Sequence, residues 1–219
     1  IINLKIYLWK IFYLLQNMLL KEKKTIILKN MSPVFIETGS YMGDAIHAVT
    51  ETPKCKKIYS IEIDKYYFDL VTARFKGNKS VELIHGDSAH CLGNVISKIP
   101  KETRITFWLD GHYSGGDTGR GVLDFPIIKE LNQINNSGRI NDIIIIDDID
   151  SFIDPAPIVE VGITRSEVIN AIMAINSNYI LTCKKLYCNQ RKNMIDTILT
   201  ARLSQSYKII STLKNLWYF

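Results

Sequence analysis

Short apolar runs alternate along this chain with segments in which apolar residues recur at every third or fourth position. The runs are typical of strands buried on both faces, and the recurring pattern is typical of helices that cover a sheet. Strands are predicted over residues 34–36, 58–64, 81–85, 104–109, 142–146 and 179–186. Residues 194–201 suit either a seventh strand, paired back as an antiparallel edge, or a short helix. The alternation predicts an α/β fold with a doubly wound sheet of about seven strands, mostly parallel with an antiparallel edge strand.

Helix signals lie between the predicted strands. Asp124 and Pro126 are typical of the start of a helix that follows the fourth strand. Thr164 and Glu167 have the spacing of a capping box, in which each side chain bonds the backbone N–H of the other residue. A further helix is therefore predicted between the fifth and sixth strands.

The N-terminal segment differs from the rest of the chain. Residues 1–20 are apolar on nearly every side and are followed by Lys21-Glu22-Lys23-Lys24. The length would suit a membrane-spanning helix, but a lysine in mid-bilayer, such as Lys10, costs roughly 2.5–3.5 kcal/mol on insertion scales. No small-residue cleavage site of a signal peptide follows. We therefore predict an apolar helix within residues 1–30 that packs on the protein or on a second copy in a homo-oligomer, with a membrane-surface helix as the alternative. Residues 31–219 are then a single domain.

Composition narrows the class of protein. The 219 residues are 47% apolar and 22% charged, as in globular proteins and not in disordered ones. The formal charge of +5 is modest and no basic run is interleaved with aromatic residues, so nucleic acid is not an expected partner. The cysteines form no C-x-x-C pair, which favours free thiols in a reducing cytoplasm. The expected location is cytoplasmic, with peripheral membrane contact if the N-terminal helix lies on a bilayer. The four cysteines are Cys55, Cys91, Cys183 and Cys188.

The segment after the first strand has the features of a ligand-binding loop. Three apolar residues lead into Glu37-Thr38-Gly39-Ser40-Tyr41-Met42-Gly43, and a run that can continue as a helix follows. A helix N-terminus presents free backbone N–H groups, which can receive an electron-rich ligand. Positions 41 and 44 are not glycine, so the segment does not have the spacing of nicotinamide-binding loops.

Acidic residues occupy the carboxyl ends of five successive predicted strands, where ligands bind in open α/β sheets. Some of them have a simpler interpretation, because Asp64 and Asp87 could cap the helices that follow. Several carboxylates at one rim would repel one another unless a cationic ligand or a metal ion shares the site. The acids are Glu37, Glu62 or Asp64, Asp87, Asp110, and Asp147 with Asp148.

The spacing Glu37-x-Gly39-x-x-x-Gly43 resembles the first motif of class I S-adenosylmethionine-dependent methyltransferases. Together with Ile61-Glu62, Gly86-Asp87-Ser88, Leu109-Asp110 and Asp147-Asp148, the chain resembles the metal-dependent O-methyltransferases of the catechol type and the macrocin type. The similarity spans about residues 34–150. It implies a Rossmann-like sheet, S-adenosylmethionine as cofactor and a magnesium ion in the site.

The resemblance also implies roles for individual residues. The loop residues Glu37, Thr38, Gly39, Ser40, Tyr41 and Gly43 approach the methionine part of the cofactor. Glu62 accepts the two ribose hydroxyls, and Asp87 and Ser88 border the adenine. Asp110 lies against the cofactor, takes part in catalysis and binds magnesium together with Asp147 and Asp148.

The chain departs from the family at the catalytic base. The catechol-type enzymes place a lysine shortly after the fourth-strand acid, whereas this chain has His112 and Tyr113. An imidazole can take a proton near neutral pH, so His112 is the candidate base, or else a loop residue that only orients Asp110. The expected reaction is methylation of a hydroxyl group on a sugar or another small-molecule or glycan acceptor. Two alternatives stay open: a non-catalytic cofactor-binding assembly subunit, and a metal-independent methyltransferase.

Overall fold

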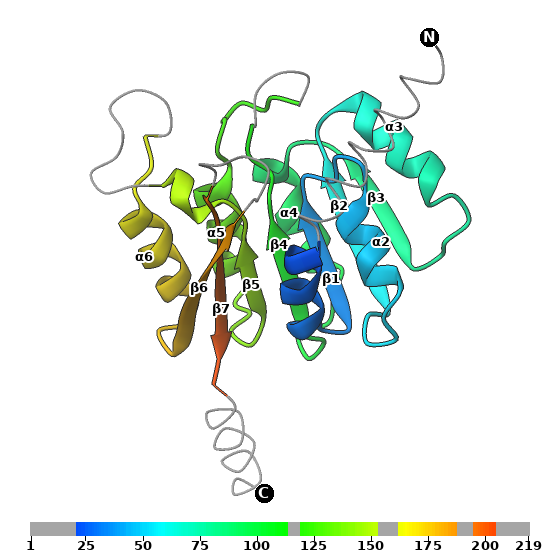
Figure 1. Cartoon of the computed structure of the whole chain (residues 1–219). Coiled ribbons are helices and arrows are strands. Elements are labelled where there is room, and N and C mark those ends of the chain that lie inside the picture. Colours follow the sequence, from blue (N-terminus) through cyan, green and yellow to red (C-terminus); the bar gives the residue numbers. More distant parts are fainter. Residues whose placement is uncertain (1–20, 114–118, 153–161, 188–194, 205–219) are drawn as a thin grey trace, which may run out of the picture.

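The computed structural model describes residues 21–113, 119–152, 162–187 and 195–204, and these residues form a single sheet covered by helices on both faces (Figure 1). All seven strands belong to this sheet. Their bounds are β1 Val34–Thr38, β2 Lys57–Glu62, β3 Val81–His85, β4 Ile105–Leu109, β5 Ile143–Ile146, β6 Tyr179–Tyr187 and β7 Ile195–Leu203.

The strands run in the order β3-β2-β1-β4-β5-β7-β6. Strands β1 to β5 pair in parallel, and β7 is antiparallel to both β5 and β6. The predicted seven-stranded, mostly parallel sheet is confirmed, and residues 195–203 form a strand and not a helix. The antiparallel strand β7 lies between β5 and β6, so β6 is the outermost strand on this side of the sheet. The β-branched residues Ile195, Thr197, Ile198 and Thr200 favour a strand at this position.

Helices lie on both faces of the sheet (Figure 1). One face carries the helix over residues 21–29 together with α2 and α3, and the other carries α4, α5 and α6. A short 3₁₀ helix, η1, follows β5. The bounds are α2 Asp44–Thr50, α3 Lys65–Arg74, α4 Ser88–Ser97, α5 Ile127–Asn136, α6 Arg165–Ile175 and η1 Ile149–Ser151.

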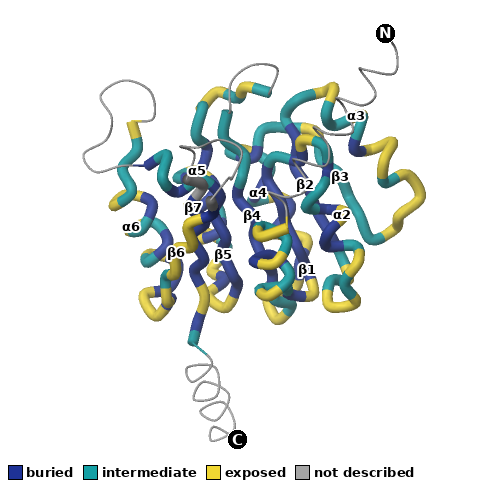
Figure 2. Tube along the Cα trace, in the orientation of Figure 1, coloured by how far each residue is buried: buried dark blue, intermediate teal, exposed yellow. Residues whose placement is uncertain are grey.

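Alternate residues of the strands feed two separate hydrophobic clusters. In β1, Val34 and Ile36 face the cluster beneath α4, α5 and α6, whereas Phe35 faces the cluster beneath the other three helices. The central strands are therefore buried on both sides, as Figure 2 shows, and this accounts for their unbroken apolar sequences.

Three predicted helix caps are present. The carboxylate of Asp64 accepts the backbone N–H of Tyr66 at 2.8 Å and opens α3. The carboxylate of Asp87 accepts the N–H of Ala89 at 2.9 Å and opens α4. Thr164 and Glu167 form both bonds of the capping box at α6. These short-range signals predicted the local structure correctly because both partners of each bond lie within one turn.

The helix over residues 21–29 is packed into the domain. Ile26 and Ile27 are buried in the same cluster as Phe35 and Trp108. The apolar segment 1–20, for which we predicted a helix, lies outside the described residues. Among the residues that are described, no helix has both the length and the apolar character needed to cross a membrane.

Candidate active site

The site lies where the strand order reverses. The chain moves outward from β1 to β2 and β3, then crosses back to β4, so the loops after β1 and β4 leave in opposite directions. The register pairs Thr38 with Leu109, and the N–H of Asp110 donates to the carbonyl oxygen of Thr38 at 3.1 Å. Gly39 has φ +82°, and a Cβ at this position would overlap the carbonyl oxygen of Asp110. Glycine is therefore required here both by the backbone conformation and by the close approach of the two loops.

Glu62, at the end of β2, holds the loop that follows β1. Its Oε2 accepts the backbone N–H groups of Ser40 at 2.8 Å and Tyr41 at 2.9 Å, and its Oε1 accepts the N–H of Asp64 at 2.8 Å. The side chain borders the cavity of the site. Because a carboxylate has about four acceptor positions, roughly one remains on Oε1 for a hydroxyl group of a ligand.

Glu37, at the end of β1, is buried with 2% exposure. Its Oε2 accepts a hydrogen bond from the Ser60 hydroxyl at 2.6 Å. Burial, together with the negative charges of Asp110, Glu62 and Asp44, raises the pKa of Glu37 well above its usual range, although the Ser60 hydrogen bond acts in the opposite direction. Glu37 is therefore a carboxyl group that gains from a nearby positive charge.

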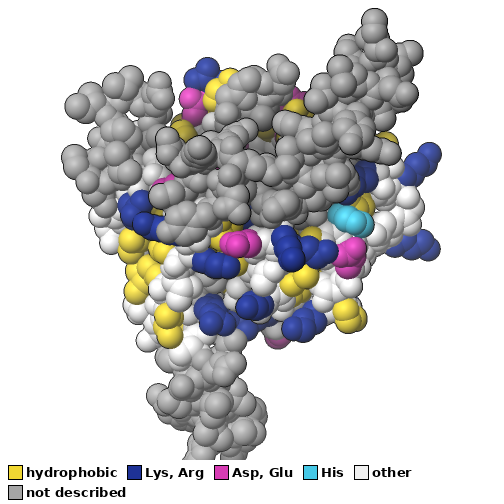
Figure 3. Space-filling view, viewed as in Figure 1, with side chains coloured by type: hydrophobic (Ala, Val, Ile, Leu, Met, Phe, Trp, Pro, Cys, Tyr) yellow, Lys and Arg dark blue, Asp and Glu magenta, His cyan; other side chains and the backbone are white. Residues whose placement is uncertain are grey.

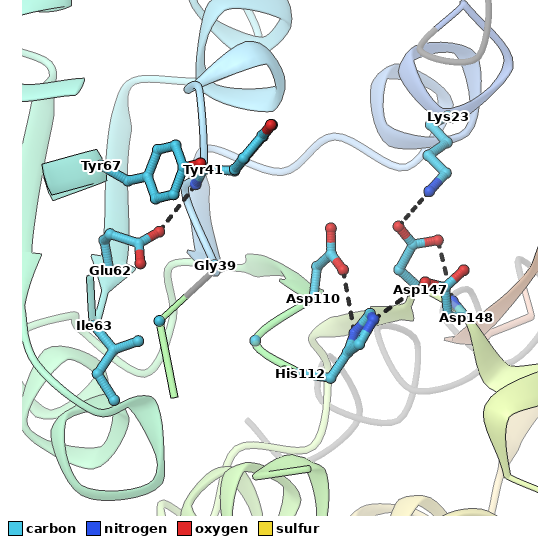
Figure 4. A pocket seen from close by; sticks show the side chains of 12 residues that line it. Lys23, Gly39, Tyr41, Glu62, Ile63, Tyr67, Asp110, His112, Asp147 and Asp148 are labelled. Atoms are coloured by element: carbon cyan, nitrogen blue, oxygen red, sulfur yellow. Dashed lines mark hydrogen bonds and ion pairs between the residues drawn. The ribbon is translucent and has the colours of Figure 1, made fainter. Parts of the chain in front are cut away.

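A cavity of about 380 Å³ lies at the ends of β1, β2, β4 and β5 (Figure 4). A second cavity of about 310 Å³ adjoins it and shares several wall residues, among them Gly39, Asp110 and Asp147. Glu37 and Ser40 line this second cavity. The first cavity is lined by Lys23, Gly39, Tyr41, Glu62, Ile63, Tyr67, Asp110, Gly111, His112, Gly119, Asp147 and Asp148.

His112 lies between two carboxylates. Its Nδ1 is 3.5 Å from Asp110 Oδ1, and its Nε2 is 3.3 Å from Asp148 Oδ2. The ring stacks on Phe125 with an interplanar angle of 2°. Burial of the ring opposes protonation, but the hydrogen bond to Asp148 and the surrounding negative charges outweigh it, so the pKa of His112 is raised. The imidazolium form is thus favoured between the two acids.

The pKa of Asp110, like that of Glu37, is strongly perturbed. Burial first, and then the charge of Asp147, raise the pKa of Asp110 well above its usual range, while Lys23 and His112 act in the opposite direction. Asp110 is consequently a stronger proton acceptor than an ordinary aspartate.

The three acids predicted to bind magnesium have different surroundings. Asp147 is almost fully buried and forms an ion pair with Lys23, with 2.6 Å between Nζ and Oδ2. Asp148 has φ +51°, a conformation that turns its side chain toward His112. Among the described residues, the group close enough to share a metal ion is Asp110, His112 and Asp148, whose ligand atoms lie within 4.8 Å of one another.

Some predicted cofactor residues do not line either cavity. Thr38 is fully buried, and its hydroxyl accepts the N–H of Asp110 at 3.3 Å. Gly43 precedes α2 with φ +78°, and a Cβ there would lie 2.9 Å from the Phe75 ring. Ser88 is buried at the start of α4.

Asp87 lines neither cavity and lies next to the chain that returns after β4. A Cβ on Gly121 would lie 3.0 Å from Asp87 Oδ2, and a Cβ on Gly119 would lie 2.6 Å from Ile63 Cγ2. The backbone at residues 119–121 therefore passes beside the residues that follow β2 and β3. The prediction that Asp87 and Ser88 border an adenine stays a prediction.

Sequence reasoning missed five residues of the cavity wall: Lys23, Ile63, Tyr67, Gly111 and Gly119. Ile63 and Tyr67 flank the end of β2, so their nearness to Glu62 could have indicated them. The rings of Tyr41 and Tyr67 are in tilted contact, with 4.7 Å between their centroids and 45° between their planes. Lys23 had no such signal, since it is 124 residues from its partner Asp147.

No protein-family model and no curated protein matches this chain. Several solved structures match it at low identity. An O-methyltransferase from Bacillus cereus in complex with S-adenosylhomocysteine has a TM-score of 0.63 and 12% identity, over 83% of this chain and 78% of that one. The O-methyltransferase TomG from Streptomyces achromogenes, involved in tomaymycin synthesis and in complex with S-adenosylmethionine, has a TM-score of 0.59 and 13% identity, over 83% and 77%.

The structural similarity is not confined to O-methyltransferases. An rRNA methylase from Streptococcus thermophilus has a TM-score of 0.54 and 11% identity, over 84% of this chain and 95% of that one. At such identities the likeness concerns the fold. Together with the strand order, it confirms at the level of architecture the resemblance expected from the motifs: this chain has the fold of the class I S-adenosylmethionine-dependent methyltransferases.

Proposed function

We propose that this protein is an S-adenosylmethionine-dependent methyltransferase that methylates a hydroxyl group of a small-molecule or sugar acceptor. One observation carries the proposal. The first cavity lies where the strand order reverses. Gly39 and Glu62, which suit the binding of a nucleoside cofactor, line it together with the proton-accepting side chains of Asp110 and His112. A transferase needs these two parts side by side, because donor and acceptor must meet in line.

The cofactor side fits S-adenosylmethionine. The absence of a side chain at Gly39 lets the loops after β1 and β4 approach each other, and the cavity lies beside that junction. Glu62 keeps an acceptor position for a ribose hydroxyl. The raised pKa values of Glu37 and Asp110 mean that a cationic ligand beside them would stabilise their ionised forms. When bound, S-adenosylmethionine supplies a methyl group on a sulfonium sulfur, which leaves with the bonding electrons as a neutral thioether.

The acceptor side holds the groups that take the proton of the acceptor hydroxyl. The Oδ1 atom of Asp110 lies 3.5 Å from Nδ1 of His112. The pKa of each group is raised, so the deprotonated form of each is a competent proton acceptor. Asp148 fixes the other nitrogen of the ring, so that His112 has a defined orientation. We assign the proton transfer to this Asp110–His112 pair.

The same residues fit a divalent cation. Two carboxylates and an imidazole provide ligand atoms within 4.8 Å of one another. Asp110, His112 and Asp148 would hold the ion, and magnesium is the ion that the family resemblance implies. When bound, such an ion lowers the pKa of a coordinated hydroxyl group.

Binding of S-adenosylhomocysteine tests the cofactor half of the proposal. Calorimetry should show binding to the wild-type protein and binding about tenfold weaker to Glu62→Gln, because glutamine loses the charge and one oxygen acceptor. Glu102→Gln, at an exposed position that lines neither cavity, is the matched control and should bind as the wild type does. Equal affinities for all three proteins would remove Glu62 from the site.

Turnover tests the other half. The protein is incubated with S-adenosylmethionine, magnesium and candidate sugar nucleotides or catechols, and the product is sought as a mass increase of one methylene unit. An assembly subunit would bind S-adenosylhomocysteine but yield no methylated product with any acceptor. Once an acceptor is found, full activity in EDTA would favour the metal-independent alternative, whereas loss of activity that magnesium restores supports the cation at Asp110, His112 and Asp148.

A further inference from the structure

The helix over residues 21–29 brings a lysine into the site. Lys23 lines both cavities and points toward the ends of β4 and β5 (Figure 4). Its position is set by packing, because Ile26 and Ile27, one turn further along the same helix, are buried in the hydrophobic cluster. The packing of this helix therefore holds the ammonium group of Lys23 at the site.

Both oxygens of Asp147 are engaged within the chain. Oδ2 accepts from Lys23 Nζ at 2.6 Å, and Oδ1 accepts from the backbone N–H of Asp148 at 3.1 Å. The Asp147 side chain is only 1% exposed, and that of Lys23 is 17% exposed. A carboxylate this deeply buried requires a partner of opposite charge, and Lys23 provides it.

The other two acids are arranged differently. Asp110 and Asp148 both face His112, at 3.5 and 3.3 Å, and each of these two side chains is about one-third exposed. Asp147 also lines the cavity, but its Oδ2 is paired with the ammonium group of Lys23. The acids at the ends of β4 and β5 thus divide into one that is paired with a lysine and two that face the same imidazole ring.

We propose that Lys23 is a built-in counter-ion that keeps Asp147 out of metal coordination, so that Asp110, His112 and Asp148 alone form the cation site. Lys23 is thereby a positioning residue, which acts through Asp147 and not on the reacting atoms. The inference rests on the proposed function, because it concerns the same site and the cation that assists the same reaction.

Titration with Mn²⁺ tests this without cofactor or acceptor, since Mn²⁺ accepts carboxylate ligands as Mg²⁺ does. In Lys23→Met the Asp147 carboxylate is released, so calorimetry should show Mn²⁺ bound about tenfold more tightly than in the wild type. Lys23→Arg keeps the positive charge and should stay within about threefold of the wild type. Asp148→Asn removes a ligand and should weaken binding about tenfold or more, whereas Asp147→Asn should change it less than about threefold.

The double variant Lys23→Met/Asp147→Asn completes a double-mutant cycle for Mn²⁺ affinity. It should return to the wild-type affinity, because the carboxylate that the first substitution releases is removed by the second. Thermal unfolding adds a readout that a merely structural lysine would not move: Mn²⁺ should raise the Tm of Lys23→Met by more than it raises the Tm of the wild type. Equal shifts in the two proteins would count against the proposal.

Two results would overturn the inference. One is that Asp147→Asn weakens Mn²⁺ binding as much as Asp148→Asn while Lys23→Met does not tighten it, which would place Asp147 among the ligands. The other is that no variant, Lys23→Met included, binds Mn²⁺. Neither result touches the proposed function if the same preparations bind S-adenosylhomocysteine, and failure of that binding would count against the proposed function alone.

Discussion

Glu130 shows how strongly burial can act on one residue beside this site. It lies on α5 with 1% exposure. Burial raises the pKa of Glu130 to about 7, although the nearby hydroxyl groups of Ser88 and Thr38 lower it in part. The neutral acid is thus the form that the folded state prefers, and ionisation at higher pH works against folding.

This predicts the direction of a pH effect on stability. The folded-state pKa lies above the unfolded value, so the folded state binds more protons between about pH 4.5 and 7. Stability therefore falls as the pH rises through that window and levels off above it. A shift from 4.5 to about 7 corresponds to about 3 kcal/mol at full ionisation. Glu130→Gln cannot ionise, so its free energy of unfolding relative to the wild type should increase by up to that amount between pH 5 and pH 8.

Urea denaturation at the two pH values measures this difference. Glu37 and Asp110 also have raised pKa values, but they are present in both proteins and largely cancel in the comparison. The exposed Glu102→Gln serves as control and should show no pH-dependent difference from the wild type. Parallel pH profiles for Glu130→Gln and the wild type would show that Glu130 does not carry this raised pKa.

At the scale of elements, the junction of β1 and β4 is the most constrained part of the site. Gly39→Ala forces a side chain into a left-handed conformation and against the backbone of Asp110. We expect a loss of stability larger than the roughly 1–2 kcal/mol of the conformational strain alone, and S-adenosylhomocysteine binding weakened about tenfold or more.

Gly77→Ala is a matched control for this prediction. Gly77 has nearly the same φ, +86°, but a Cβ there meets nothing within 4 Å. Gly77→Ala should lose only the stability that corresponds to the backbone strain, and its affinity for S-adenosylhomocysteine should be unchanged. If the two substitutions have equal effects on stability and neither weakens binding, then the close approach of the loops after β1 and β4 is not what shapes the cofactor site.

At the scale of the whole molecule, the face that carries the helix over residues 21–29 is rich in lysine and arginine (Figure 3). Lys21, Lys29 and Lys184 are exposed on or beside this helix, and Lys184 lies 3.6 Å from Glu22. The apolar segment 1–20 precedes this helix in the chain. Two kinds of partner are therefore open to the N-terminal region: protein, through apolar contact, or an anionic membrane, through apolar and basic contact together.

We expect the first of these. Deleting residues 1–20 should change the oligomeric state or the solubility of the protein, as measured by light scattering after size-exclusion chromatography. Neither the full chain nor the deletion should cosediment with vesicles that contain anionic lipid. Cosedimentation of the full chain alone, reduced at high salt, would instead establish a membrane-surface helix.

The local features of this protein could be predicted from the sequence alone. Apolar runs and helix periodicity identified six strands and the helices between them, because the faces on which an element is buried determine which of its residues are apolar. The same pattern left residues 194–201 open between a strand and a short helix. The caps at Asp64, Asp87 and Thr164 were equally readable, since both partners lie within one turn. The order of acids at the strand ends placed Glu62, Asp110 and Asp148 at one cavity, because parallel strands end at the same edge of a sheet.

Only the tertiary structure decided which of these acids are available to a ligand. Asp147 and Asp148 are neighbours in sequence, yet one is paired with Lys23 and the other faces His112. The place of β7 between β5 and β6 likewise depends on contacts between distant segments. The residues next to Lys23 in the sequence do not show which carboxylate it pairs with, because a lysine side chain carries the same charge wherever it lies. Its effect is set by the carboxylate that the fold brings within reach and by how completely water is excluded from the pair.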